Sequence, residues 1–331
     1  MQVCIDLAKK GLPNAFPNPL VGCILVHEGE ILGQGYHQYY GQAHAEVNAI
    51  ASVINPSLIK NSTLYVNLEP CAHFGKTPPC SKLIIEKGIK KVVIGALDTF
   101  SKVNGKGIEN LRKAGVQVKS SVLEMECRKL NKRFFTFHEK KRPYIILKWA
   151  KSNDGFLAPN NQKEPFWMTG DEAKKRVHKW RSRESAILVG TNTVLIDNPR
   201  LTTRDFIGKN PIRIILDRSL RIPKHLNIYN SEATTLIVNE KYSDKNHIKV
   251  DFEHLVRDLL QQLYQRNIKS LIVEGGAQTL NAFIHSNNWD EARVFKTKMN
   301  LDKGVQAPVF EHNISKIENI GDDQLSYFYN T

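Results

Sequence analysis

The sequence Glu69-Pro70-Cys71-Ala72-His73-Phe74-Gly75-Lys76-Thr77-Pro78-Pro79-Cys80 follows the tripeptide His44-Ala45-Glu46. The histidine and the two cysteines offer one imidazole and two thiolates, a ligand set that Zn²⁺ prefers. Three protein ligands leave the fourth tetrahedral position for a water, whose pKa zinc lowers toward about 7. We therefore expect a catalytic zinc site at His44, Cys71 and Cys80.

The carboxylate of Glu46 is expected to carry protons between the activated water and a leaving group. His44 and Glu46 cannot share one face inside a helix, but they can converge where a helix begins. Gly41-Gln42 and the apolar run from Val47 predict such a helix start. Cys80 is predicted to open the next helix, whose N-terminus would favour the thiolate form.

Other interpretations of this region remain open. His73 could complete a closed structural zinc site, or the thiols could be unrelated buried side chains. A closed site would leave Glu46 without a task, which favours the catalytic interpretation. His73 and Lys76 lie between the two cysteines, where they suit a phosphorylated substrate or form part of a solvated loop.

The first 140 residues around this motif alternate strand and helix patterns, which predicts a sheet with helices on its faces. Strands are expected at 21–27, 30–36, 63–68, 91–97 and 116–120, and helices at 43–53, 81–87 and 108–114. A single amphipathic basic helix is expected through 123–142, with a buried apolar stripe. Pro143 ends this helix, and we place the domain boundary there, giving domains 1–142 and 143–331.

The composition of the chain limits the classes of protein to which it can belong. The 331 residues are enough for two domains, and the formal charge is 47 − 33 = +14. No apolar run approaches the roughly 20 residues of a membrane span. Five cysteines are too few for a disulfide scaffold, and Asp6 interrupts the N-terminal apolar stretch, which is unlike a signal peptide. We expect a cytoplasmic protein that acts on a small molecule, with neither a membrane nor a nucleic acid as partner.

The positive charge has two interpretations, a polyanionic partner or lysine-rich solvated surfaces. A nucleic-acid deaminase or binder, and a non-catalytic zinc module, are the competing classes of function.

The second half of the chain again alternates between helix and strand patterns. Helices are predicted at 171–181 and 252–265, and strands at 144–150, 186–189, 212–216, 234–238 and 270–273. Glu274-Gly275-Gly276 after the last of these strands suits a phosphate, although it is not a G-x-G-x-x-G fingerprint.

The motifs together resemble the bifunctional riboflavin-biosynthesis deaminase–reductase family over nearly the whole chain. They are Asn18-Pro-Leu-Val-Gly22, His44-Ala-Glu46, the segment 69–80, Gly190-Thr-Asn-Thr-Val194, Asp197-Asn-Pro199, Arg213-Ile-Ile-Leu-Asp217 and Glu274-Gly-Gly276. The resemblance implies a cytidine-deaminase-like α/β/α domain followed by a dihydrofolate-reductase-like domain that binds NADPH. It also implies hydrolytic deamination of a phosphoribosylamino-diaminopyrimidinone, then reduction of its ribosyl group to ribityl, and it suggests a homo-oligomer.

The same resemblance implies roles for individual residues. Those expected to contact the deaminase substrate are Asn18, His37, His73 and Lys76. Those expected to hold the reductase substrate are Arg181, Leu201, Arg204 and Glu274. Those expected to hold NADPH are Ala150, Trp167, Thr193, Asp197 and Gly276.

The sequence departs from the family pattern mainly in its second half. Phe100 stands where the family has asparagine, Asn153 and Phe156 alter the first reductase turn, and Pro165 replaces a serine before the Trp-x-Thr motif. The region 298–304 lacks the expected Ala-Pro-x-Leu-x-Gly-Gly. These changes are either tolerated sequence drift, which the retention of the arginines favours, or they indicate an active deaminase with a degraded reductase domain.

Overall fold

The computed structural model describes residues 1–72, 78–100, 105–162 and 164–330. The chain divides into two compact units, Met1–Lys140 and Lys141–Thr331, and each is described by itself. Within the described ranges, no helix combines the length and apolar character that crossing a bilayer requires.

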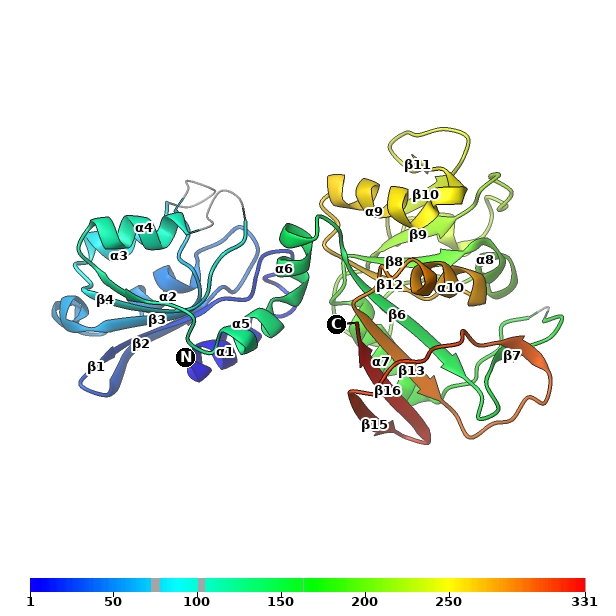
Figure 1. Ribbon diagram of the computed structural model, residues 1–331, viewed down its shortest axis with the longest axis horizontal. Helices are drawn as coiled ribbons and strands as arrows, with labels where there is room; N and C mark the ends of the chain where they lie inside the picture. The colour runs from blue at the N-terminus through cyan, green and yellow to red at the C-terminus, as the bar shows by residue number, and fades with distance from the viewer. Residues whose placement is uncertain (73–77, 101–104, 163, 331) are drawn as a thin grey trace. The chain divides into compact units, whose positions relative to one another are not determined.

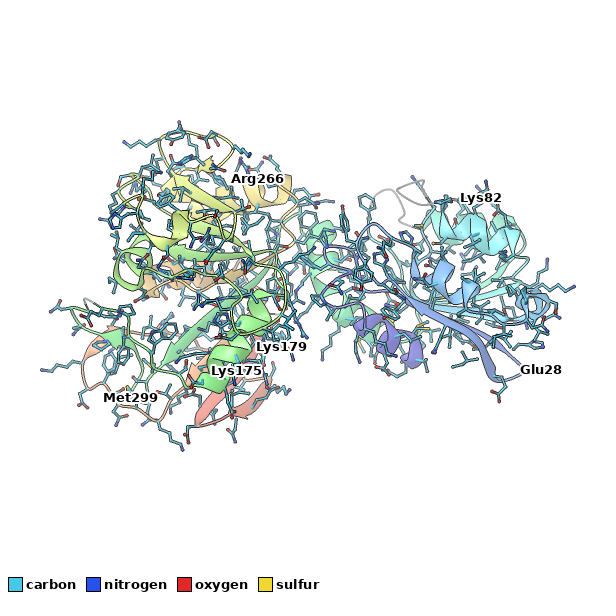
Figure 2. The ribbon with its side chains drawn as sticks, turned by 180° about the vertical axis from the view of Figure 1, so that it is seen from behind. Glu28, Lys82, Lys175, Lys179, Arg266 and Met299 are labelled. Carbon is cyan, nitrogen blue, oxygen red and sulfur yellow. The ribbon has the colours of Figure 1, made fainter. Side chains whose placement is uncertain are left out.

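The first unit is built on a five-stranded sheet with the order β2-β1-β3-β4-β5 (Figure 1). Its strands are β1 (Gly22–His27), β2 (Glu30–Tyr36), β3 (Thr63–Leu68), β4 (Lys91–Ala96) and β5 (Gln117–Lys119). Strand β1 is antiparallel to β2 and β3, whereas β3, β4 and β5 are parallel. The carboxyl ends of β3 and β4 therefore lie at the same edge. Glu28, labelled in Figure 2, marks the turn between β1 and β2.

Helices cover both faces of this sheet. They are α1 (Gln2–Lys9), α2 (Ala45–Ala51), α3 (Cys80–Glu86), α4 (Lys106–Lys113), α5 (Glu124–Leu130) and α6 (Lys132–Glu139), with a 3₁₀ turn η1 (Pro56–Asn61). Ala49, Ile84 and Leu111 place α2, α3 and α4 against one core. Ile5 and Cys127 place α1 and α5 in a core on the other face, as Figure 1 shows. This is the α/β/α arrangement expected from the sequence.

The prediction of one continuous basic helix through 123–142 is wrong. The helix is interrupted at Asn131, and Leu123 is exposed rather than part of the buried stripe. The physical reason is a tertiary contact: the buried Asn131 amide accepts from Leu20 N at 2.8 Å and donates to Leu20 O at 2.9 Å. Cys127 and Phe134 remain buried, so the apolar face persists across the break.

The second unit contains a nine-stranded sheet with the order β11-β10-β9-β8-β12-β6-β13-β16-β15. Its strands are β6 (Tyr144–Lys151), β8 (Ala186–Gly190), β9 (Ile212–Leu216), β10 (Thr235–Asn239), β11 (His247–Lys249), β12 (Ser270–Val273), β13 (Glu291–Lys296), β15 (Lys316–Ile320) and β16 (Asp323–Tyr329). Neighbours from β11 to β13 are parallel, whereas β16 is antiparallel to both β13 and β15. A separate ribbon pairs β7 (Phe156–Pro159) with β14 (Gly304–Gln306).

Four helices and two 3₁₀ turns complete the described part of this unit. They are α7 (Asp171–Arg181), α8 (Thr191–Asp197), α9 (Leu255–Gln265), α10 (Ala277–His285), η2 (Asn227–Tyr229) and η3 (Phe252–His254). Leu259 and Phe283 place α9 and α10 in one core, and Val177 and Val194 place α7 and α8 in the core on the opposite sheet face. The largely parallel sheet is thus covered on both faces, which explains its continuous apolar strands.

Candidate active sites

The metal ligands expected from the sequence lie at three element ends of the first unit. His44 is the residue before α2, Cys71 follows the end of β3, and Cys80 is the first residue of α3. The expectation that both helices begin at these positions is confirmed. Pro79 directly precedes α3, and a proline there costs no helical hydrogen bond because the first turn has none to lose.

The donor atoms converge as a zinc site requires. His44 Nδ1 lies 3.5 Å from Cys71 Sγ and 3.3 Å from Cys80 Sγ, and the three ligand atoms all lie within 4.8 Å of one another. Zinc–sulfur bonds of about 2.3 Å and a zinc–nitrogen bond of about 2.0 Å at tetrahedral angles put nitrogen about 3.5 Å from sulfur. The distances in this chain therefore fit the ion.

One of the two sulfur atoms is stabilised as a thiolate by its neighbours. The backbone N–H of Cys80 donates to Cys71 Sγ at 3.3 Å. A hydrogen bond from the Cys80 side chain lowers the pKa of the Cys71 thiol, and the same contact raises the pKa of Cys80. One thiolate is thus stabilised by its protein neighbours alone, while the second would need a cation.

Glu46 lies in the first turn of α2 and is only 3 % exposed. Burial, followed by the nearby Cys71, raises the pKa of its carboxyl to about 7, and the Cys80 side chain is one of its hydrogen-bond partners. The carboxyl is therefore next to the ligand atoms, as the helix-start geometry predicts.

Asn18 and His37 form a hydrogen-bonded pair beside these ligands. His37 Nδ1 lies 3.0 Å from Ala43 O and donates to it, so Nε2 is left to accept from Asn18 Nδ2 at 3.1 Å. The His37 ring meets the His44 ring edge-on, with centroids 5.6 Å apart. Burial lowers the pKa of His37, in keeping with a neutral ring.

Two buried amides hold the segment that carries Asn18. Asn67 accepts from Gly22 N at 2.7 Å and donates to Leu20 O at 3.0 Å, while Asn131 bonds both backbone groups of Leu20. A loop residue fixed on both its N–H and C=O has little freedom. His73 and Lys76, the other two residues expected at this site, lie outside the described residues.

Glu69 has an architectural role that the sequence did not reveal. Its carboxylate accepts from four backbone N–H groups, those of Asp98, Gly105, Gly107 and Ile108, at 2.9–3.2 Å. It therefore satisfies the first amides of α4 and ties that helix to the residue two positions before Cys71.

The residues expected around NADPH gather mostly at the carboxyl edge of the second sheet. Gly276 precedes α10, and a Cβ built on it would meet Thr193 of α8 at 4.0 Å. Asp197 ends α8 and accepts from Gln162 Nε2 at 3.2 Å; burial raises its pKa. Ala150 lies near the carboxyl end of β6, opposite Phe295 of β13. Trp167 is 63 % exposed, with Lys174 Nζ 5.2 Å from its ring centroid.

The four residues expected to hold the reductase substrate surround the end of α7. Arg181 forms an ion pair with Glu274 at 2.9 Å and donates to Thr202 O at 3.4 Å. Arg204 donates to the hydroxyl of the same threonine at 3.4 Å, and Leu201 is buried nearby in the α7 core. Arg181 and Lys148 hold the pKa of Glu274 below its usual range, against the effect of burial.

Comparison with known proteins decides the family. Residues 143–297 match the family model described as RibD C-terminal domain, and residues 1–96 match that of the cytidine and deoxycytidylate deaminase zinc-binding region. The chain is 39% identical to the riboflavin biosynthesis protein RibD of Aquifex aeolicus over 99% of this chain and 97% of that protein. The RibD of Actinobacillus pleuropneumoniae is 42% identical, over 96% of this chain and 88% of that protein.

The chain belongs to the RibD family. Among solved structures, the deaminase/reductase of Thermotoga maritima superimposes with a TM-score of 0.89 at 37% identity, covering 100% of this chain and 97% of that one. Acinetobacter baumannii RibD (form 1) gives a TM-score of 0.91 at 31% identity, with the same two coverages. This RibD family member is therefore a bifunctional enzyme of riboflavin biosynthesis, with a zinc-dependent deaminase fold and a dihydrofolate-reductase-like NADPH-dependent reductase fold.

The RibD fold also contains a partly buried lysine that the sequence analysis did not single out. Lys148 sits in the apolar strand β6, next to the position where β12 runs into Glu274. Burial lowers the pKa of Lys148, and the Glu274 charge opposes that effect. The signal was available, because a lysine in the middle of Tyr144–Trp149 interrupts an otherwise apolar buried strand.

Two buried polar atoms of the Arg181–Glu274 pair have no hydrogen-bond partner among the described residues, Arg181 Nε and Glu274 Oε1. Buried polar groups are nearly always paired, so unpaired ones beside an ion pair suit a polar ligand. One of these atoms is a donor and the other an acceptor, so a ligand group that can both donate and accept, such as a hydroxyl, would fit both.

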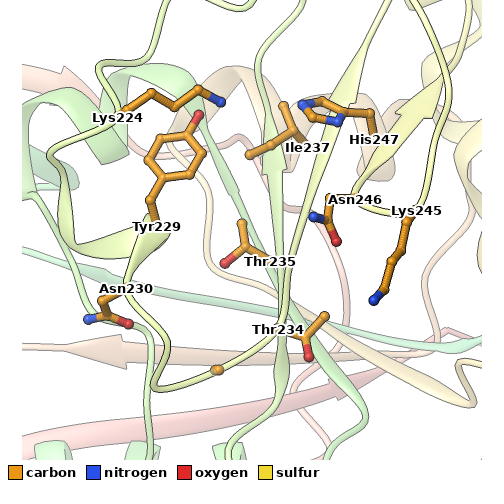
Figure 3. A pocket seen from close by; sticks show the side chains of 10 residues that line it. Lys224, Tyr229, Asn230, Thr234, Thr235, Ile237, Lys245, Asn246 and His247 are labelled. Carbon is orange, nitrogen blue, oxygen red and sulfur yellow. The ribbon is translucent and has the colours of Figure 1, made fainter.

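A cavity of about 380 Å³ lies elsewhere in the reductase unit (Figure 3). Figure 3 shows Lys224 and Tyr229 on one side of β10, and Lys245 and His247 on the other. Thr235 and His247 open β10 and β11, so this cavity is at the amino edge of the parallel strands. Gly276 follows the carboxyl end of β12, at the opposite edge, and the cavity is therefore not the expected cofactor site.

Proposed function

We propose that residues 1–142 deaminate 2,5-diamino-6-(5-phosphoribosylamino)pyrimidin-4(3H)-one and that residues 143–331 reduce the ribosyl group of the product. The Thermotoga maritima protein bears the names of a diaminohydroxyphosphoribosylaminopyrimidine deaminase and a 5-amino-6-(5-phosphoribosylamino)uracil reductase, and it covers the whole of this chain. The convergence of His44, Cys71 and Cys80 beside the buried Glu46 is the observation that carries the deaminase assignment.

In the deamination, water adds to C2 of the pyrimidine, the C2–N bond of the amino group breaks, and ammonia leaves. Zinc, when bound by His44, Cys71 and Cys80, would lower the pKa of the attacking water. Glu46 takes the water proton and returns it to the departing amine, a role that its position in the first turn of α2 supports. Asn18 and His37, fixed to each other at 3.1 Å, contact the base.

His73 and Lys76 belong to the same proposal, as contacts to the substrate phosphate. An imidazole and an ammonium between two ligands would place donors within reach of a phosphorylated molecule. Both residues lie outside the described residues, and their sequence position alone supports this assignment.

NADPH, when bound, would supply the hydride for the reduction at C1′ of the ribosylamine. In that reduction the C1′–O bond of the sugar ring opens, and the ring oxygen takes up a proton. Arg181, Leu201, Arg204 and Glu274 would hold the substrate. Ala150, Trp167, Thr193, Asp197 and Gly276 would hold the cofactor. The protein's contribution is to orient two ligands, because the chemistry belongs to the nicotinamide.

Turnover of the diaminopyrimidinone phosphate by the purified protein, with and without NADPH, tests both halves. We expect ammonia release without NADPH, and both ammonia release and loss of NADPH absorbance when the cofactor is present. Ammonia without NADPH consumption would instead support a degraded reductase, for which the replacement of a serine by Pro165 is the motivating change.

We also propose a cellular location and an oligomeric state for this protein. The five cysteines are free, and two of them are needed as thiolates, so a reducing compartment such as the cytoplasm suits the chain. We further propose a homo-oligomer, by analogy within the family, which light scattering on the purified protein would test. Absence of a gel shift with single-stranded RNA at low salt would exclude a nucleic-acid partner.

A further inference from the structure

A buried histidine on α7 connects that helix to the loop that carries Arg204. His178 is 4 % exposed. Its Nδ1 accepts from the backbone N–H of Arg204 at 3.0 Å, and its Nε2 lies 3.3 Å from Asp205 Oδ2. Both ring nitrogens are thus committed to two consecutive residues of the loop.

These contacts fix the protonation state of the ring. A backbone N–H can only donate, so Nδ1 must be the acceptor and carry no proton. Nε2 then carries the proton and faces the Asp205 carboxylate, 3.3 Å away. Protonation of Nδ1 would set two donors against each other and break the bond to Arg204.

The rest of the loop also lies along α7. Lys179 Nζ is 5.6 Å from the centroid of the Phe206 ring, and a Cβ on Gly208 would meet Ser182 Cβ at 2.5 Å. Figure 2 labels Lys179 on this helix. These two contacts involve later residues of the loop, whereas the hydrogen bond from Arg204 to His178 holds the backbone of Arg204 itself.

The charges around His178 come from three elements. Arg181 is on its own helix, Arg204 and Asp205 are on the loop, and Glu274 follows β12. Burial lowers the pKa of His178 most, Arg181 and Arg204 lower it further, and the two carboxylates oppose them. The environment therefore favours the neutral ring that the hydrogen bonds require.

We propose that His178 is a positioning residue of the reductase half: its neutral imidazole holds Arg204 in place and thereby sets the affinity for the phosphorylated pyrimidine. The inference rests on the proposed function, which assigns Arg204 to the substrate. His178 contacts neither substrate nor cofactor in this scheme and acts through the loop alone.

The test compares four variants of the full-length zinc enzyme, one of them Arg204→Ala, using the deaminated pyrimidine and NADPH. His178→Ala is expected to raise KM for the pyrimidine about five- to tenfold, the effect of a lost hydrogen bond, with kcat and KM for NADPH within about twofold. His178→Asn places an amide oxygen near the Nδ1 position and is expected to restore most of the affinity. His247→Ala, at a histidine of the amino-edge cavity, is the matched control and should leave KM unchanged.

The pH profile adds a second readout. In the wild type, KM for the pyrimidine should rise as pH falls and Nδ1 of His178 becomes protonated. In His178→Asn, the part of this rise that is due to His178 should be absent. The substrate phosphate also titrates near a pH of about 6, but it does so identically in both proteins. The difference between the two profiles therefore isolates His178.

The outcomes separate the inference from the proposed function. A KM for NADPH close to the wild-type value shows that the reductase unit of each variant is folded. If Arg204→Ala raises KM but His178→Ala does not, or if the two profiles coincide, His178 has no positioning role. If Arg204→Ala itself leaves KM unchanged, the assignment of Arg204 to the substrate is what fails, and the inference is overturned with it.

Discussion

The guanidinium of Arg181 lies 2.9 Å from the carboxylate of Glu274, although 93 positions separate the two residues in the chain. Arg181 is the last residue of α7, and Glu274 is the first residue after β12. The sheet order brings them together, because β12 lies in the middle of the nine strands. An ion pair between a helix end and a strand end thus joins two of the residues assigned to the reductase substrate.

Glu274→Gln is expected to lower reductase turnover at least tenfold while deaminase activity stays within about twofold, a difference of about 1.4 kcal/mol or more in barrier. The variant leaves the Arg181 charge without its partner in a nearly buried position, which should cost up to about 3 kcal/mol of folding stability. NADPH oxidation and chemical denaturation measure the two effects. Glu253→Gln, at an exposed position of η3, is the control. Normal reductase turnover in Glu274→Gln would contradict a role in substrate binding.

The same pair predicts a dependence of stability on pH. The pKa of Glu274 is lower in the folded protein than in the unfolded chain, so its charge stabilises the fold above the unfolded value of about 4.3. That contribution is lost as pH falls below this value and through the folded pKa. The stability difference between wild type and Glu274→Gln should therefore shrink on acidification, as denaturation at several pH values would reveal. A difference that grows instead would mean that burial outweighs Arg181 and Lys148.

Glu46→Gln should reduce deamination by about 10²–10⁴-fold, because the amide cannot carry the proton. Zinc content and reduction of the deaminated pyrimidine should remain normal, since Glu46 is not one of the three converging ligand residues. Glu86→Gln, at the exposed end of α3, is the matched control. Full deaminase activity in Glu46→Gln would instead show that Glu46 does not carry the proton.

Removal of the metal should separate the two activities. Chelation, or Cys80→Ser, is expected to abolish deamination and metal content together, because each ligand atom contributes to one three-donor site. Reduction of the deaminated pyrimidine should persist, and addition of Zn²⁺ should restore deamination to the chelated wild type. Metal analysis and the two separate assays give the result, and loss of both activities at equal rates would argue against independent sites.

Asn131→Ala should destabilise the deaminase unit by about 1–3 kcal/mol, because it leaves the buried N–H and C=O of Leu20 with fewer partners. The KM for the diaminopyrimidinone should rise as well, since the hydrogen bonds between Asn131 and Leu20 also hold the segment that carries Asn18. Asn110→Ala, at an exposed position of α4, is the control for loss of an asparagine. An unchanged KM together with reduced stability would confine Asn131 to a structural role.

Much of the architecture followed from local pattern. The strands Thr63–Leu68 and Ile212–Leu216 and the helix Asp171–Arg181 have the bounds that the sequence predicts, because their apolar spacing is unbroken. The zinc ligands were equally accessible, since their residue types and spacing indicate the chemistry before any fold is known.

What the sequence concealed depends on contacts between distant segments. The break at Asn131 follows from its bonds to Leu20, which no helical pattern encodes. The strand Glu291–Lys296 was missed because Glu291 and Arg293 look like surface residues, yet they are buried and pair at 2.7 Å. The strands Lys316–Ile320 and Asp323–Tyr329 are mostly polar on one face. They form at one end of the nine-stranded sheet, where pairing with neighbouring strands, and not an apolar pattern in the sequence, determines their structure.

The carboxylate of Glu69 has a consequence for engineering this scaffold. It anchors α4 through backbone amides, and Gly107 leaves no room for a side chain, because a Cβ there would meet Pro70 O at 2.0 Å. A methyl group added at Gly107 would push on the proline that separates Glu69 from Cys71. The rigidity of the segment that leads into Cys71 thus depends on a helix that supplies no reactive group. Redesign of α4 to change the deaminase activity would therefore shift Cys71 and disturb coordination of the ion, although α4 holds no ligand.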